Sequence, residues 1–325
     1  MPVVLLAVLA AFLMVAPTAA HADPEGGTKT LRDALESAAK GHLEATAKLN
    51  ASKKRQIQLG GTLKRAQADA ARMQTQVEVT AGRAYRYGRV TTMTLLLNSS
   101  SPDTFLERMS RLDTMAQLDG RALADYRRAV DTTKAAQRAI GREIGEQQKQ
   151  VDILARKKKE AEAALASVGG GSVAGGFIDA DSPLAKPAPR TSNGSWPKES
   201  CTVNDPTTTG CITPRLLNAY QQARSAGFNH YTSCFSHRDS GEHPKGRACD
   251  FSANASTFRN VAASGGDKAY GDRLAGYFVK NASRLGVMYV IWFRQIWLPN
   301  TGWRAYSASG GPAAVHTNHV HLSVL

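Results

Sequence analysis

A heptad repeat in the first half of the chain restricts its fold more than any other feature. From Leu123 to Leu154, apolar and small polar residues recur at alternating steps of three and four. Such steps place the residues on one stripe of an α-helix, the stripe through which two helices pair in a coiled coil. The stripe consists of Leu123, Tyr126, Val130, Thr133, Gln137, Ile140, Ile144, Gln147, Val151 and Leu154. We therefore expect a long helix that requires a helical partner.

An earlier stretch of the chain supplies that partner. The same steps join Leu63, Ala66, Ala70, Met73 and Val77, and Ala81 follows four residues later. Between the two stretches, Gly88 is expected to end the first helix, and Ser101-Pro102-Asp103 has the N-cap, first-position proline and early acid that start a second one. Residues 23–166 are therefore predicted to form an antiparallel coiled-coil hairpin.

Residues 1–22 have the pattern of a signal peptide. An apolar run from Val3 to Val15 is followed by Ala20-His21-Ala22, which is a small-x-small cleavage site. No Lys or Arg precedes the run, so a misassigned start codon and an uncleaved anchor stay open as alternatives. We expect a secreted, extracytoplasmic protein whose mature chain begins at Asp23.

The four cysteines agree with export, because an even number in an oxidising compartment indicates two disulfides. Four cysteines allow three connectivities. We favour Cys201–Cys211, which closes a small polar loop, and Cys234–Cys249, which ties two expected strands together. A cysteine-rich metal site is the weaker alternative, because the chain has no C-x-x-C pair.

The remaining sequence divides into a linker and a second domain. Residues 167–195 are rich in Gly and then in Pro, which predicts a flexible joint followed by a stiffer spacer. Residues 196–325 predict an α+β domain, an antiparallel sheet with flanking helices. The expected helices begin at Thr213-Pro214 and at Asp267, and the expected strands are 230–236, 247–252, 287–293, 295–298 and 319–325.

The net charge of +14 predicts anionic partners. For an exported protein these are wall polymers, lipid head groups or the carboxylates of peptidoglycan. Nucleic acid is excluded as a partner, because export removes it and the sequence has no recognition motif for it.

Two short motifs near the C-terminus carry the candidate chemistry. His243 and Asp250 are separated by six residues, and His319 and His321 lie in an apolar run that predicts a strand. Alternation along a strand places both of these histidines on one face, about 6.5–7 Å apart. Two imidazoles and a carboxylate are a ligand set that suits catalytic Zn²⁺ with a fourth position open.

With Gly246 and Ala248, these motifs resemble the zinc peptidase group of D-Ala-D-Ala carboxypeptidases, lysostaphin-type endopeptidases and hedgehog proteins. The run His316-Thr-Asn-His319-Val-His321 is most similar to the penicillin-insensitive murein endopeptidases. The resemblance implies that His243, Asp250 and His321 are the zinc ligands. It also implies that His319 is a catalytic base or transition-state stabiliser and that His316 shapes the substrate side or orients a ligand.

One departure from this group bears on the reaction. Carboxypeptidase relatives have a Glu-x-x-His segment whose Glu is the base, whereas His316, Thr317 and Asn318 precede His319 here. Their substrate-anchoring Arg is matched only by a displaced Arg238. An endopeptidase is therefore expected in preference to a carboxypeptidase. Trp303, in a turn-rich segment beside Arg304, is a candidate for stacking on substrate.

A second resemblance covers the tip of the hairpin. Ala84-Tyr-Arg-Tyr-Gly88 and the segment from Leu95 to Arg108 are similar to the coiled coils of division-associated murein hydrolases and their activators. In that family the arm docks onto a membrane transporter-like complex. The combined expectation is a secreted zinc-dependent peptidoglycan peptidase on a coiled-coil arm. The rival readings are a non-catalytic wall-binding regulator and an enzyme whose own coiled coil covers the cleft.

Overall fold

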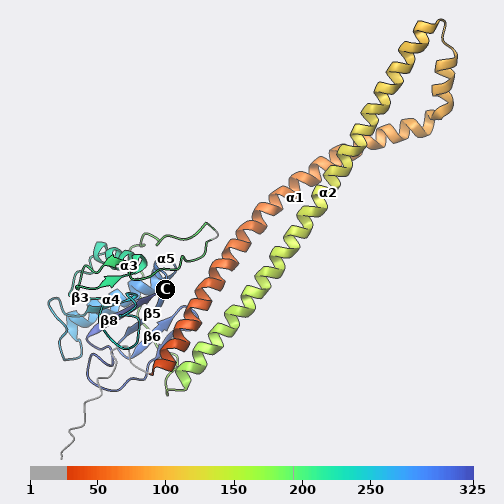
Figure 1. Ribbon diagram of the computed structural model, residues 1–325. Coiled ribbons are helices and arrows are strands. Elements are labelled where there is room, and N and C mark those ends of the chain that lie inside the picture. Colours follow the sequence, from red (N-terminus) through yellow and green to blue (C-terminus); the bar gives the residue numbers. More distant parts are fainter. Residues whose placement is uncertain (1–27, 193) are drawn as a thin grey trace, which may run out of the picture.

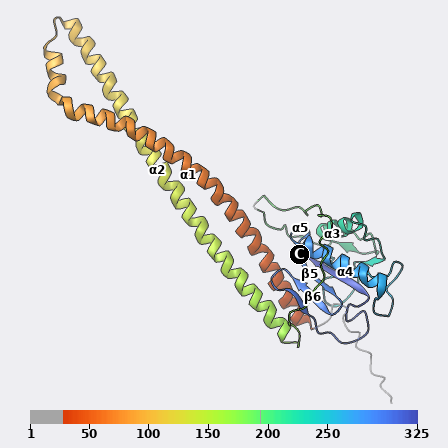
Figure 2. The same ribbon diagram turned by 180° about the vertical axis from the view of Figure 1, so that it is seen from behind.

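The structure is a computed structural model that describes residues 28–192 and 194–325, with only the backbone of 87–92 and 95. A long helical hairpin projects from an α+β domain that lies beside the base of the hairpin (Figures 1 and 2). The predicted signal segment, residues 1–22, lies outside the described residues. Across the described ranges, no helix combines the length and the apolar character needed to cross a bilayer.

The hairpin consists of α1 (Lys29–Leu97) and α2 (Pro102–Ala166). The start of α2 is as predicted: the Ser101 hydroxyl accepts a hydrogen bond from the Thr104 amide at 3.2 Å, and the Thr104 hydroxyl accepts one from the Ser101 amide at 2.9 Å. The end of α1 differs from the prediction, because the helix continues through Gly88 to Leu97. One glycine weakens a helix by only about 1 kcal/mol and leaves its hydrogen bonds intact.

The contact between the two helices follows the prediction for α1 but only half of it for α2. On α1, Ala66 is buried and the other residues of its stripe from Leu63 to Val77 are half-buried. On α2, the buried positions include Ala129 and Ala136, which the predicted stripe omits. The residues that the structure instead leaves partly in solvent are Leu123, Ile144 and Val151, which are 38%, 52% and 46% exposed. Alanine lines let two helices approach closely, so α2 turns its small residues toward α1.

The C-terminal domain is built on a six-stranded antiparallel sheet with the order β3-β4-β8-β5-β6-β7. A separate two-stranded sheet pairs β1 with β2. The strand predictions are largely confirmed, although β3 is shorter than expected and β1, β2 and β7 were not predicted. The strands are β1 Val203–Asn204, β2 Cys211–Ile212, β3 Thr232–Ser233, β4 Ala248–Ser252, β5 Val287–Trp292, β6 Gln295–Leu298, β7 Gly302–Ala305 and β8 His319–Val324.

Helices cover both faces of the large sheet. On one face, α3 (Pro214–Ser225) and α4 (Gly265–Lys280) pack on β8 through Leu216, Leu274 and Phe278, and the short α5 (Ala282–Leu285) follows α4. The other face is covered by the first turns of α1, where Leu31 and Leu35 share a buried cluster with Ile291 and Ile296. The base of the hairpin is therefore a structural layer of the domain.

The segment expected to be a flexible joint instead lies against the domain. The Ala174 amide donates to the Trp303 carbonyl at 3.3 Å, and the Ala188 amide donates to the Arg284 carbonyl at 2.8 Å. Ala185 and Ala188 are buried. The Gly- and Pro-rich composition thus reflects close backbone contact with the sheet edge and α5. The hairpin is therefore held to the domain both at the start of α1 and through the segment that follows α2.

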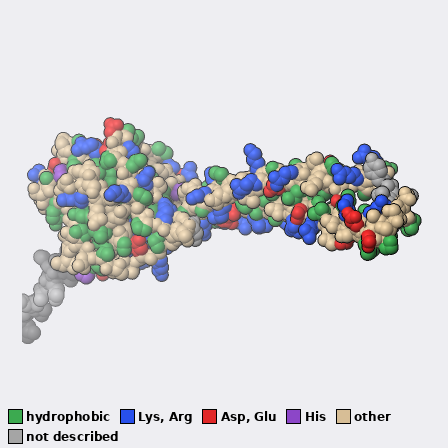
Figure 3. Space-filling model, turned by 90° about the horizontal axis from the view of Figure 1, so that it is seen from above, with side chains coloured by type: hydrophobic (Ala, Val, Ile, Leu, Met, Phe, Trp, Pro, Cys, Tyr) green, Lys and Arg blue, Asp and Glu red, His purple; other side chains and the backbone are tan. Residues whose placement is uncertain are grey.

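Both disulfides have the favoured pairing, Cys201–Cys211 and Cys234–Cys249. The second joins the end of β3 to β4. Basic side chains are distributed over both the domain and the arm in Figure 3, in keeping with the net charge of +14.

Candidate metal centre

The loop between β3 and β4 positions His243. Its Nδ1 donates to the Cys234 carbonyl, which turns Nε2 toward β4. The loop closes tightly because the Gly246 amide donates to the His243 carbonyl at 3.0 Å. Gly246 has φ +67°, and a Cβ there would lie 2.5 Å from Cys201 Sγ. Only glycine satisfies both demands.

Strand pairing positions the other three groups. On β8, His319 and His321 alternate with Val320 and therefore share a face of the sheet. Asp250 on β4 is the register partner of His321. This face is the one that α1 covers farther along, because Ile291, the β5 partner of His321, belongs to the cluster beneath α1.

These side chains converge on one oxygen. Asp250 Oδ1 lies 3.2 Å from His243 Nε2, 2.9 Å from His321 Nδ1 and 3.4 Å from His319 Nε2. The ligating atoms of His243, Asp250 and His321 all lie within 4.8 Å of one another, and all three residues are buried. Two nitrogens and a carboxylate oxygen within this spacing could hold a metal ion, and zinc accepts a donor set of this chemistry.

Unsatisfied nitrogens support the same interpretation. His319 Nδ1 donates to Asn318 Oδ1 at 2.8 Å, whereas its buried Nε2 has no hydrogen-bond partner. Neither ring nitrogen of His316, which is fully buried, has a partner. The His316 ring centroid lies 4.8 Å from that of His319 and 5.7 Å from that of His321. Buried polar atoms without partners are costly, and their concentration here indicates a site that receives a ligand.

His316 also has a strained backbone, with φ +52°. Such a conformation costs a residue with a side chain on the order of 1 kcal/mol or more, and it is concentrated at functional sites. The strain aims the ring inward, where Tyr306 lies 6.4 Å away between ring centroids. The ring of His316 is fully buried, so this residue does not lie on an exposed loop surface.

The electrostatics favour a charged Asp250 beside a neutral His316. Burial acts to raise the pKa of the Asp250 carboxyl, but attraction to His243 and His319 outweighs it and holds this pKa well below its usual value. Burial lowers the pKa of His316 well below its usual value, and repulsion from His319 and His321 adds to the effect. A neutral His316 beside a carboxylate is compatible with a bound cation.

The two more distant candidates behave differently. Arg238 reaches the site: its Nη2 lies 3.7 Å from Asp250 Oδ2, and its buried Nη1 has no hydrogen-bond partner. Trp303 does not, because it lies on β7, three strands from β8 in the sheet order. Its ring packs edge-on against Phe177 at 5.2 Å and fits against Gly176. The structure therefore places Trp303 away from the site.

Several site residues were missed by the motif search. Ser323 Oγ lies 2.8 Å from His321 Nε2, Tyr289 stacks on the His321 ring at 5.6 Å, and Asn318 orients His319. Ser323 was detectable, because it lies two residues after His321 on the same strand face. The position of Tyr289 depends on strand order and left no local signal.

The hairpin also contacts the loop that carries His243. Arg32 on α1 donates to the Ser240 hydroxyl at 2.6 Å, and Glu36 accepts from Arg247 at 2.6 Å and from Lys245 at 3.1 Å. Burial opposes ionisation of Glu36, but Arg247 and Lys245 together lower its pKa to about 2. Burial raises the pKa of the neighbouring Glu242 to about 7. The first turns of α1 thus form a side wall of the loop.

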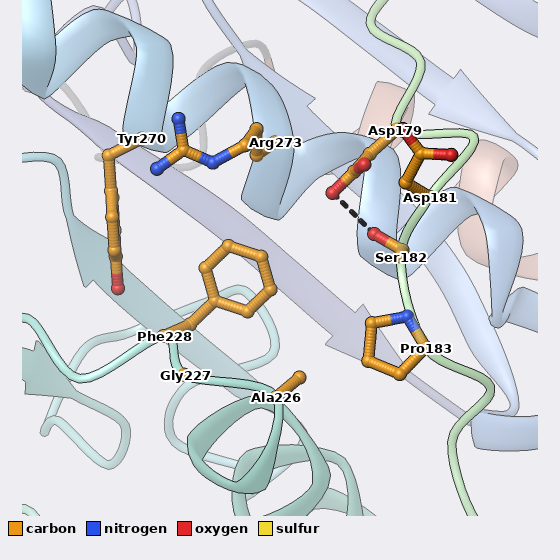
Figure 4. Close-up of a pocket in the computed structure, with 9 residues that line it drawn as sticks. All are labelled: Asp179, Asp181, Ser182, Pro183, Ala226, Gly227, Phe228, Tyr270 and Arg273. Carbon is orange, nitrogen blue, oxygen red and sulfur yellow. Dashed lines mark hydrogen bonds between the residues drawn. The ribbon is translucent and has the colours of Figure 1, made fainter.

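A separate pocket lies on the opposite, helical side of the sheet (Figure 4). It has a volume of about 220 Å³ and lies between the segment 179–183, the end of α3 and the middle of α4. Phe228 and Tyr270 provide its aromatic walls, and the Asp179 carboxylate accepts a hydrogen bond from Ser182. None of the four histidine or aspartate residues of the candidate metal centre lines it.

Comparison with known families gives one partial match. The family model described as VldE, C-terminal domain, matches residues 208–317, about a third of the chain. The match includes His243 and Asp250 but ends before His319 and His321. No curated protein matches the chain. No solved structure matches it.

Proposed function

We propose that the protein is a secreted, zinc-dependent peptidoglycan peptidase, most specifically an endopeptidase that hydrolyses stem-peptide or cross-link amides. The observation that carries the proposal is the convergence of His243, Asp250 and His321 within 4.8 Å, with an unpartnered Nε2 of His319 directed at the same carboxylate. The resemblance of both motifs to murein endopeptidases supplies the substrate class.

His243 Nε2, Asp250 Oδ1 and His321 Nδ1 would hold the zinc ion. When bound, zinc polarises a scissile carbonyl and makes a water molecule more acidic. The surrounding groups fix the ligands: Cys234 orients His243 and Ser323 orients His321. Such outer contacts set the tautomer and direction of each imidazole.

His319 is the proposed general base. Because Nδ1 donates its proton to Asn318 Oδ1, the lone pair of the neutral ring is on Nε2, which faces the site. A base there accepts the proton of the attacking water and returns it to the leaving amine. His316 lines the substrate side, where its neutral ring accepts or donates one hydrogen bond.

Arg238 is the proposed substrate anchor. Its Nη1 is buried and unpartnered, and its charge lies beside the ligand carboxylate. A guanidinium in that position holds a carboxylate or carbonyl of a stem peptide. The single contact to Asp250, at 3.7 Å, leaves the remaining donors of the group for substrate.

The hairpin is the proposed delivery arm. Its tip carries exposed apolar side chains, including Leu97, Leu106 and Met109, which are 81%, 62% and 54% exposed. A patch of this kind supports docking to a membrane division or transporter-like complex. The basic charge of the chain supports retention at anionic wall polymers.

Turnover of cross-linked sacculi tests the proposal. The purified full chain, loaded with zinc, is expected to release muropeptides with new amino termini, and His319→Ala is expected to abolish release while keeping its zinc. Mass spectrometry of the products identifies the amide that is cut. No release by either protein, with zinc bound to both, would instead identify a non-catalytic wall-binding regulator, and equal release by both would remove His319 as the base.

A further inference from the structure

A line of mostly apolar residues on α2, which we call the α2 stripe, lies largely outside the contact that α2 makes with the described side chains of α1. It consists of residues spaced by seven positions along one flank of the helix, and four of them, Met109, Leu123, Ile144 and Val151, are between 38% and 54% exposed. Toward the tip the line begins at Met109, 54% exposed, and toward the domain it ends at Val151, 46% exposed. Its members are Met109, Ala116, Leu123, Val130, Gln137, Ile144 and Val151.

The stripe is exposed because α2 turns its alanines, not its larger residues, toward α1. Ala129 and Ala136 occupy the hairpin interface, while Leu123 and Ile144 lie on its flank. A single exposed leucine on a helix needs no explanation. A heptad line of apolar residues does, because this is the pattern by which a helix pairs with another helix.

A groove follows the stripe at its centre. It has a volume of about 340 Å³, and Val130 and Gln137 of the stripe line it together with Gln67 and Gln74 of α1. Gln67 and Gln74 are themselves seven residues apart, so the groove runs along both helices. A third helix laid in it would place its side chains between two heptad lines.

Glycines beside the stripe permit close approach of another backbone. Gly141 lies one turn from both Gln137 and Ile144, and Gly145 follows Ile144. A Cβ at either glycine would meet no atom within 4 Å, so the packing of the chain itself does not require glycine there. Each glycine costs a helix about 1 kcal/mol relative to alanine. A helix docked beside Gly141 and Gly145 would explain why glycine is present at these positions, because its backbone could approach α2 closely there.

The charges along the groove select the partner. The heptad lines that flank it carry three cations, Lys53, Arg127 and Lys134, all exposed. One carboxylate accompanies them: Glu78 of α1 accepts a hydrogen bond at 2.8 Å from Gln74, so these three cations outnumber it beside the groove. A second copy of this chain, with a net charge of +14, would bring the same cations to the groove.

We propose that this groove binds an amphipathic helix of another protein, one with an apolar residue at every seventh position and Asp or Glu on its flanks. The site lies on the shaft of the hairpin, between the tip and the domain. It does not depend on the metal centre or on the proposed peptidase activity.

The test uses a synthetic helix as the probe. The peptide has about four heptads, with Leu at every seventh position, Glu on both flanking lines and Ala elsewhere, so that it is helical without pairing with itself. Its binding to the purified full chain is followed by fluorescence anisotropy at low salt. A second peptide, with Lys in place of Glu, tests the role of charge.

Variants of the stripe are compared with a matched control. Val130→Asp/Ile144→Asp places charges on the stripe, whereas Leu118→Asp changes a residue that is 55% exposed but lies five positions before Leu123, on the far side of α2. Circular dichroism verifies that each variant stays helical. We expect the stripe variant to bind the Glu peptide at least about tenfold more weakly than wild type, and Leu118→Asp to bind it equally well.

Three results would overturn the proposal. The first is equal binding of the Glu peptide by wild type and the stripe variant, including no binding by either. The second is tighter binding of the Lys peptide than of the Glu peptide by wild type. The third is self-association of the chain in sedimentation that the stripe variant abolishes, because the stripe would then belong to a second copy.

Discussion

Asp250 and His321 face each other across β4 and β8, with 2.9 Å between Oδ1 and Nδ1. They are register partners, so the pairing of the two strands fixes their separation. His243 is the one member of the three-residue cluster that a loop provides, and the turn at Gly246 and the Cys234–Cys249 disulfide hold that loop. The candidate metal centre is therefore as rigid as the sheet itself.

Replacement of His321 by Ala is expected to weaken zinc binding by at least about 100-fold, because it removes one of three proposed ligands. Zinc affinity measured against a competing chelator checks this. His230→Ala is the matched control, since His230 stacks on Tyr270 and is not part of the cluster. Equal affinity in wild type and His321→Ala would remove His321 from the metal centre.

Replacement of Asn318 by Ala is expected to lower turnover by about 10–100-fold while zinc content stays unchanged. The Asn318 Oδ1 fixes the His319 ring through Nδ1, and without it Nε2 no longer faces the site in one tautomer. The measurement compares kcat with bound zinc for each protein. A fall in zinc content that parallels the fall in kcat would indicate that Asn318 supports the ligands instead.

Replacement of Gly246 by Ala is expected to destabilise the domain by several kcal/mol, because a positive φ and a contact of 2.5 Å with Cys201 Sγ act together. Gly227→Ala separates the two causes, since Gly227 also has positive φ, +94°, but no atom within 4 Å of its Cβ. Urea unfolding should therefore show a larger loss for Gly246→Ala. Equal losses would mean that the contact with Cys201 relaxes freely.

Replacement of Glu36 by Gln is expected to lower stability at pH 7 by on the order of 1–2 kcal/mol, because it removes the ion pairs with Arg247 and Lys245. The folded-state pKa of about 2 lies below the ordinary value of 4.5, so the Glu36 contribution is complete above pH 4.5 and is lost as the pH falls toward 2. Thermal unfolding of both proteins between pH 7 and pH 3 should show curves that converge below pH 4.5. A constant difference across that range would contradict the ion-pair explanation.

Local sequence patterns predicted most of the helices and strands of this protein. The cap at Ser101, the helix start at Thr213 and the alternation from His319 onward were all readable, because each depends on neighbours within a few residues. The disulfide pairing was one of three open connectivities, and the favoured one is present. The close approach of His243 to Asp250 followed from motif spacing and a single tight turn.

The sequence patterns did not predict how the helices and the sheet are oriented relative to one another. A heptad pattern fixes which residues share a stripe but not which of two adjacent stripes faces α1, and alanines at 129 and 136 decided that choice. The docking of Leu31 and Leu35 on the sheet joins residues more than 250 positions apart, a relationship that no local pattern encodes. Composition likewise predicted a flexible joint at 167–195, where backbone hydrogen bonds hold the segment to the domain.

The seat of α1 on the sheet has a mechanical consequence. A helix of 69 residues extends about 100 Å, and its first turns are clamped between the sheet and the loop that holds His243. The hairpin is thus a lever that pivots beside the candidate metal centre. A small rotation of α1 where it packs on the sheet moves the tip of the hairpin by a large distance. A force applied at the tip acts back on the loop that holds His243.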